Sequence, residues 1–260
     1  MERGWSESGG PRRIREEQMR ELLLGKAVDL LRPTGLTVSL EHLNLEELIR
    51  SAGVPRSSVY KAFGNKDAFF RELMIRLIET MEISGSDLDP GLAQRIQATA
   101  HAHGSRLGTP AGRREVGREI IRLSVKKNYE SVRTSTEWRT YIALSATVSS
   151  LDPTSRTAVV DALARAESRT TAARSAAFDH LLPLLGLKFR VGLDARQLAT
   201  VAAAIVNGLA QRSLVNPEVV DTPVVLPGID GDPVEWHLSA VGVMAVLDEM
   251  TEPIEGAHSA

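Results

Sequence analysis

The stretch from Leu45 to Phe70 constrains the fold more than any other part of the chain. Its sequence, LEELIRSAGVPRSSVYKAFGNKDAFF, predicts a helix, a tight turn, a short second helix and the start of a third helix. Asn44 suits the N-cap of the first helix, and Gly53 suits a left-handed turn at its C-terminal end. Asn65 is placed to cap the third helix. The segment therefore predicts three helices joined by short turns.

The second of these helices, from about Pro55 to Phe63, has two chemically different faces. Val59, Ala62 and Phe63 fall on an apolar face and are predicted to be buried. Polar, basic and aromatic side chains fall on or beside the other face. These are Arg56, Ser57, Ser58, Tyr60 and Lys61. Because a helix of this kind can enter the major groove of DNA, the pattern indicates a nucleic-acid contact.

Each exposed group on this helix suits DNA. Arg56 can reach guanine O6 and N7 bidentately, or a phosphate. Tyr60 can pack its ring on the protein and donate its hydroxyl to a phosphate, and lysine charges bind phosphates with release of counterions. The predicted DNA-binding residues are Asn44, Arg56, Ser57, Ser58, Tyr60, Lys61 and Lys66. Asn44 could meet a phosphate as well as cap its helix.

Most of the remaining sequence also predicts helices, because apolar residues recur at steps of three and four. The expected helices are Ile14–Leu31, Lys66–Ile83, Gly91–His103, Arg113–Val132, Thr136–Ser149, Pro153–Leu185, Ala195–Leu214 and Pro233–Met250. Asn216–Asp232 is expected to be irregular, and no segment gives a convincing strand pattern. Aromatic residues make up only 4% of the chain, so its core must be mostly Leu, Val, Ile and Ala. The sequence therefore predicts an all-α fold.

The bulk composition narrows the class of protein. The chain has no cysteine, which excludes disulfides and thiolate metal sites. Its N-terminal residues lack a secretion signal and its apolar runs are too short to cross a bilayer, so a cytoplasmic protein with no membrane partner is expected. Residues 1–66 hold 11 of the 31 Lys and Arg but only 9 of the 33 Asp and Glu. This small excess of positive charge has the sign expected for a DNA-binding segment.

The run Ala52–Phe70 resembles the N-terminal DNA-binding region of the tetracycline-repressor (TetR) family. That family's pattern is Ala-Gly-Val-Ser, a few variable residues, and then Leu/Val-Tyr-x-x-Phe-x-x-Lys-Glu/Asp-x-Leu/Phe. The matching positions are Ala52, Gly53, Val54, Val59, Tyr60, Phe63, Lys66 and Asp67. Pro55 departs from the pattern, since it stands where the family usually has a capping Ser or Thr. The segment between Gly35 and Asn44 is also longer than usual.

The resemblance implies an N-terminal three-helix helix-turn-helix DNA-binding domain and a larger C-terminal helical bundle for ligand binding and dimerisation. We expect residues 1–66 to form a flexible arm and the DNA-binding domain. Residues 67–260 are expected to bind the effector and form the dimer. The implied partners are a palindromic DNA operator, a second copy of the chain and an unknown small molecule that releases the DNA. Most members of the family repress transcription. No cofactor, metal or catalytic residue is expected.

Several alternatives stay open at this stage. Leu198, Ala202, Ile205 and Leu209, and likewise Trp236, Ala240, Val243, Leu247 and Met250, have the spacing of a helix–helix seam, in the core or between subunits. Trp138, Tyr141 and Phe178 are candidates for the ligand pocket, or simply core residues. The polar middle of Pro153–Leu185 either faces solvent or lines a polar cavity. Arg12, Arg13 and Arg15 either enter a minor groove or belong to a disordered tail.

The chief functional alternative is an all-helical enzyme, or a small-molecule or lipid-binding protein, without DNA binding. Against an enzyme, no Gly-x-Ser-x-Gly elbow and no phosphate-binding loop occur in the sequence. His101 and His103 lie two residues apart, so a helix would direct them to different faces. The sequence therefore favours a dimeric, ligand-responsive transcriptional regulator that is not an enzyme.

Overall fold

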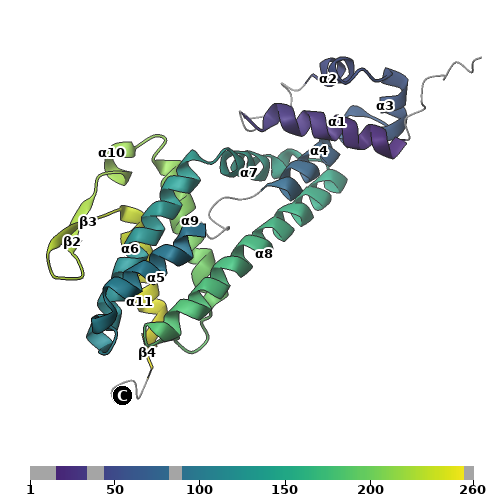
Figure 1. Ribbon diagram of the computed structural model, residues 1–260. Helices are drawn as coiled ribbons and strands as arrows, with labels where there is room; N and C mark the ends of the chain where they lie inside the picture. The colour runs from purple at the N-terminus through teal and green to yellow at the C-terminus, as the bar shows by residue number, and fades with distance from the viewer. Residues whose placement is uncertain (1–15, 34–43, 82–89, 255–260) are drawn as a thin grey trace, which may run out of the picture. The chain divides into compact units, whose positions relative to one another are not determined.

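The computed structural model describes residues 16–33, 44–81 and 90–254, and helices dominate them (Figure 1). The all-α prediction is confirmed. The α-helices are α1 (Glu16–Leu31), α2 (Leu45–Ala52), α3 (Arg56–Phe63), α4 (Lys66–Thr80), α5 (Pro90–Ala102), α6 (Pro110–Thr134), α7 (Thr136–Thr147), α8 (Pro153–Leu184), α9 (Ala195–Arg212), α10 (Pro217–Val220) and α11 (Leu238–Met250). Short 3₁₀ turns cover Gly104–Arg106 and Val148–Ser150. The strands are β1 (Leu187–Phe189), β2 (Val224–Pro227), β3 (Pro233–Trp236) and β4 (Thr251–Pro253).

Helix ends follow local chemistry closely. The Asn44 side chain accepts hydrogen bonds from the backbone N–H groups of Glu46 and Glu47, at 3.1 and 3.4 Å. Gly53 adopts the left-handed conformation, with φ of 65°, and its N–H donates to Arg50 O. These two caps confirm the boundaries that the sequence predicts for α2. The Asn65 side chain likewise accepts from Ala68 N at 2.8 Å and caps α4 as predicted.

Two helices begin at prolines that the sequence pattern places in the breaks between helices. Helix α5 begins at Pro90 and helix α6 at Pro110, earlier than the predicted Gly91 and Arg113. A proline is tolerated in a first helical turn because the N–H it lacks would have no partner there. Thr109 caps α6, since its hydroxyl accepts from Gly112 N at 3.0 Å.

Contacts divide the chain into two compact units. The first unit comprises Met1–Thr80 and Ile142–Ala162, and the second comprises Met81–Tyr141 and Leu163–Ala260. The expected division into domains between residues 66 and 67 stays a prediction. Ile14, the three arginines of the predicted basic arm, the segment after Gly35, and residues 82 and 83 lie outside the described residues.

In the first unit, α1 packs against α2, α3 and α4. Its core consists of fully buried side chains from these helices, including Leu23, Phe69 and Leu73. The Phe63 and Phe69 rings meet edge to face at 5.2 Å between centroids, which locks α3 to α4. This aromatic contact is local in sequence but depends on the turn at Gly64, where φ is 82°.

In the second unit, α6, α9 and α11 pack against one another, and α5 covers part of α6. The seam residues predicted on α9 and α11 divide between two environments. Leu198, Ala202, Ala240, Val243, Leu247 and Met250 are buried within the chain, whereas Ile205 and Leu209 are only half-buried. At Gly242 an added Cβ would lie 3.1 Å from Ile205 Cγ2, so glycine permits the close approach of α9 and α11.

The prediction of a single helix over Pro233–Met250 is wrong at its start. Pro233–Trp236 forms β3 instead and pairs antiparallel with β2, with Val224 opposite Trp236. The stretch expected to be irregular, Asn216–Asp232, contains α10 and β2. A second two-stranded sheet joins β1 to β4, with Lys188 opposite Glu252. Trp236 is 1% exposed and belongs to the buried core together with Ala240 and Val243 of α11. It therefore matched their helical spacing in the sequence, although it lies in a strand.

A small buried polar cluster joins α6, α10 and the start of α11. The Tyr129 hydroxyl donates to Asp221 Oδ1 at 2.6 Å, and its ring lies 3.9 Å from the His237 ring between centroids. The His237 Nδ1 accepts from Ser239 N and caps α11. Burial lowers the pKa of His237, and the charge of Asp221 opposes this shift. The lowered pKa favours the neutral form of His237, whose Nδ1 can accept the capping hydrogen bond.

Among the described residues, no helix is both long and apolar enough to cross a membrane.

The turn between α2 and α3 generates the first testable prediction. Gly53→Ala is expected to lower the free energy of unfolding by about 1–2 kcal/mol, because alanine is strained in the left-handed conformation. No atom lies within 4 Å of the added Cβ, so the effect would come from the backbone alone. Gly25→Ala, inside α1 and equally open, is the matched control and should raise stability by about 0.5–1 kcal/mol. Urea titrations followed by circular dichroism measure both, and equal effects of the two variants would contradict the assignment.

Candidate nucleic-acid interface and ligand pocket

The two faces of α3 are separated as the sequence predicts. Val59, Ala62 and Phe63 are buried, with exposures of 1, 2 and 6%. On the opposite side Arg56, Ser57 and Lys61 are exposed, while Ser58 and Tyr60 are half-buried. Asn44 and Lys66 are exposed as well, so all the predicted DNA-binding side chains reach the surface of the first unit.

A carboxylate organises the centre of this surface. Glu46, in the first turn of α2, accepts a hydrogen bond from the Tyr60 hydroxyl at 3.2 Å. The same oxygen, Oε1, lies 3.0 Å from Arg56 Nη2, and the Arg56 guanidinium stands 5.3 Å from the centre of the Tyr60 ring. The pKa of Arg56 is raised above its ordinary value, chiefly by hydrogen bonding with Tyr60 and to a smaller extent by the charge of Glu46. We call Glu46, Arg56 and Tyr60 the α2–α3 cluster.

The two predicted lysines have different surroundings. Lys61 is exposed near the C-terminal end of α3. Lys66 begins α4, and its Nζ lies 5.3 Å from the centre of the Phe70 ring. Pro55 is the N-cap of α3. Its side chain has no acceptor, so no side-chain hydrogen bond caps the first turn of α3. The departure of Pro55 from the family pattern therefore has the structural consequence expected from the sequence.

Arg20 positions α3 and was not found from the sequence. Its guanidinium donates to the backbone carbonyl of Ala62, pairs with Glu72 on α4 and lies 5.1 Å from the centre of the Phe63 ring. One side chain of α1 thus ties the end of α3 to α4. The available signal was an arginine next to Met19, a buried residue of an apolar helix face. That signal is too weak to separate Arg20 from an ordinary surface residue.

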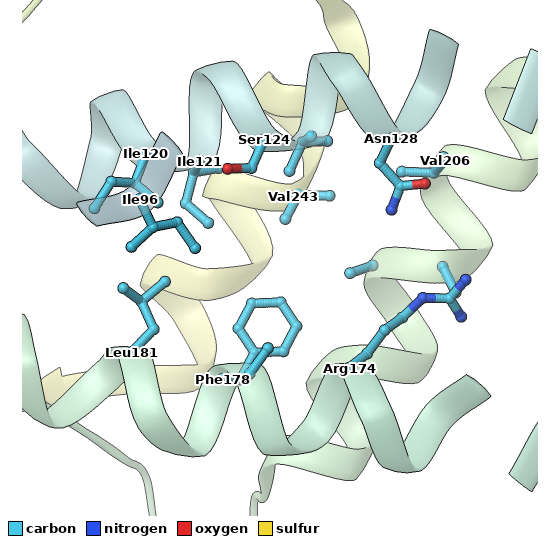
Figure 2. Close-up of a pocket in the computed structure, with 14 residues that line it drawn as sticks. Ile96, Ile120, Ile121, Ser124, Asn128, Arg174, Phe178, Leu181, Val206 and Val243 are labelled. Atoms are coloured by element: carbon cyan, nitrogen blue, oxygen red, sulfur yellow. The ribbon is translucent and has the colours of Figure 1, made fainter. Parts of the chain in front are cut away.

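The second unit contains a pocket of about 120 Å³ between α6, α8, α9 and α11, with Ile96 of α5 at one end (Figure 2). Its walls are mainly aliphatic. The lining residues are Ile96, Ile120, Ile121, Ser124, Val125, Asn128, Arg174, Ala177, Phe178, Leu181, Ala202, Ala203, Val206 and Val243. Among the candidates from the sequence, Phe178 lines this pocket, whereas Trp138 and Tyr141 do not.

The other two candidates have structural surroundings. Trp138 is 3% exposed, and Tyr141 donates its hydroxyl to Glu167 Oε2 at 3.4 Å. The polar middle of α8 also divides. Arg165, Ser168 and Arg169 are exposed, as preferred from the sequence, but Thr170 and Thr171 are buried and Arg174 lines the pocket. Both interpretations of this helix therefore apply, each to a different face.

Part of the chain matches a known protein family. Residues 39–73, which include α2 and α3, match the family described as bacterial regulatory proteins, tetR family. No curated protein sequence matches the chain.

Two similar solved structures are the reduced form of NemR from Escherichia coli and the TetR transcriptional regulator SCO0520 from Streptomyces coelicolor. The first has 17% identity, a TM-score of 0.46, and coverage of 90% of this chain and 98% of that chain. The second has 18% identity, a TM-score of 0.32 and the same coverage. These superpositions are loose. The similarity of this chain to bacterial regulatory proteins of the tetR family therefore comes from the match over residues 39–73, which covers the helix-turn-helix.

Proposed function

We propose that two copies of this chain bind a palindromic or nearly palindromic operator in double-stranded DNA and repress transcription until a small molecule releases them. The observation that supports this most is the outward face of α3, where Arg56, Tyr60 and Lys61 stand opposite a fully buried apolar face. In this proposal residues 1–66 provide the DNA contact, and residues 67–260 provide the effector pocket and the dimer.

The proposed contacts follow from the chemistry of each side chain. Arg56 reads a base edge after leaving Glu46, since guanidinium groups pair bidentately with guanine. Ser57 and Ser58 are short enough to let the helix approach the groove closely. Lys61 and Lys66 contact phosphates, and Asn44 brings the N-terminus of α2 to another phosphate.

Dimerisation is supported by the outer face of α9 and α11. Residues 201–210 and 238–247 contain no charged residue. Val201, Ala204 and Ala245 are nevertheless exposed, and Ile205 and Val246 are half-buried. An exposed pair of helices without charge is typical of a surface that is covered by another protein. We therefore assign this face to the contact between two copies of the chain.

We expect no enzymatic activity, as is general for tetR-family regulators. The second candidate, an all-helical enzyme or lipid-binding protein without DNA binding, has no comparable observation in its favour. Within residues 16–33, 44–81 and 90–254, no three His, Asp or Glu side chains gather where they could hold a metal ion.

DNA binding is tested by fluorescence anisotropy with the duplex upstream of the chain's own gene, at several salt concentrations. Arg56→Ala is expected to cost about 1–3 kcal/mol on the specific site if it reads a base. Lys61→Ala should weaken all duplexes alike and reduce the salt slope by about one. Lys127→Ala, an exposed lysine on α6, is the control and should change neither quantity. A wild-type chain that binds no duplex at low salt would overturn the proposal.

The α2–α3 cluster makes a second prediction. An exposed ion pair contributes only about 0–1 kcal/mol, so Glu46 holds Arg56 weakly while its charge repels phosphates. Glu46→Gln should therefore tighten binding to unrelated DNA by up to about fivefold and reduce discrimination for the operator. Glu47→Gln removes the same charge from the adjacent exposed position and is the matched control. Weaker operator binding in Glu46→Gln alone would mean that the carboxylate chiefly positions Arg56.

The proposed dimer face gives a third prediction. Ala204→Arg would place a charge in the middle of the apolar face of α9, and it should convert the dimer to a monomer at micromolar concentration. Ala172→Arg, at an exposed position on α8, should leave the mass unchanged. Light scattering after size exclusion measures both variants. A wild-type chain that is monomeric in this measurement would contradict the proposed assembly.

A further inference from the structure

The pocket of the second unit has a polar end and an apolar end. In Figure 2, Arg174 on α8 and Asn128 on α6 lie across the cavity from each other near one end. Ile96, Ile120, Phe178 and Leu181 enclose the other end. A ligand that fills this space needs an apolar body and one polar head.

The charge at the polar end favours an anionic head. Burial lowers the pKa of Arg174, which means that its guanidinium has lost part of its contact with water. The charge of Glu167 opposes that shift. Glu167 already accepts from the Tyr141 hydroxyl and, at 3.4 Å, from the Thr171 hydroxyl, so its charge is shared among several donors. A carboxylate in the pocket would give Arg174 a second, bidentate partner.

Asn128 can supply a second hydrogen bond to such a head group. In the part of the chain that the structure describes, its side-chain oxygen is buried and accepts no hydrogen bond. A buried polar atom without a partner costs free energy. In Figure 2 the NH₂ group of Asn128 is directed into the space between α6 and α8, where it can donate to a carboxylate that Arg174 also binds.

The volume limits the size of the apolar body. The cavity of about 120 Å³ is slightly smaller than the roughly 150 Å³ space that accommodates benzene in an engineered protein core. A short aliphatic chain or a single ring is therefore the largest tail that this volume favours. A long fatty acyl chain does not.

We propose that this pocket binds a small apolar monocarboxylate, with the carboxylate between Arg174 and Asn128 and the tail against Phe178 and Leu181. The inference rests on the proposed function in one respect, which is that this pocket is the effector site. Binding itself is independent of DNA.

Calorimetric titration of the full chain without DNA tests the ligand class. The probes are hexanoate and benzoate, with hexan-1-ol and hexylamine as the neutral and cationic counterparts. Hexanoate should bind at least about tenfold more tightly than hexan-1-ol, because a charged hydrogen bond is stronger than a neutral one. Hexylamine should not bind. Equal affinities for hexanoate and hexylamine, or no binding of either acid, would overturn the proposal.

Variants locate the head group. Arg174→Met keeps an unbranched apolar stem but removes the guanidinium, and it should weaken hexanoate binding about tenfold to a hundredfold while leaving hexan-1-ol binding unchanged. Arg169→Met, at an exposed position of the same helix, is the control and should bind hexanoate normally. Undiminished hexanoate binding by Arg174→Met would exclude the assigned role. If Arg174→Met does not fold, the comparison of hexanoate with hexylamine in the wild-type chain still decides.

A separate anisotropy titration with DNA distinguishes this inference from the proposed function. Hexanoate that binds the chain but does not release DNA would support the ligand class and contradict release by this effector. A chain that binds DNA but no acid would retain the regulator and overturn the ligand class alone.

Discussion

The orientation of α3 depends on the burial of its apolar face. Three of its residues, Val59, Ala62 and Phe63, lie in the core of the first unit, and the helical period then directs Arg56 and Lys61 outward. An eight-residue helix is too short to be stable by itself, so packing must supply most of its stability. The edge-to-face contact with Phe69 and the hydrogen bond from Arg20 to the Ala62 carbonyl provide fixed points at its C-terminal end.

Local signals explain why so much of this unit could be predicted. The caps at Asn44 and Asn65 and the left-handed turn at Gly53 act within a few residues, and a single sequence shows them directly. The role of Arg20 could not be predicted in this way, because it joins residues that are 42 and 52 positions apart. Its contacts exist only after α1 has packed against α3 and α4.

The structure of the second unit differs more from the sequence prediction, because it also depends on contacts between residues that are distant in the sequence. Trp236 lies four residues before Ala240 and looks like a helical neighbour, yet pairing with β2 draws it into a strand. The pocket likewise needed the structure, because Asn128 and Arg174 come from helices that are distant in the sequence. Trp138 and Tyr141 were singled out as aromatic residues on one helix face. That property does not distinguish a core position from a lining position.

The charge of a carboxylate acts on two arginines of this chain, Arg56 and Arg174, under opposite conditions. Arg56 is 67% exposed, so water can replace Glu46 at little cost and a phosphate or a base edge can do the same. Arg174 is half-buried and has lost part of its contact with water, so a charge placed beside it has a larger electrostatic effect. The exposed pair therefore suits the DNA contact that we propose for Arg56. The half-buried guanidinium of Arg174 suits the carboxylate site that we propose, because an amine placed beside it would be repelled.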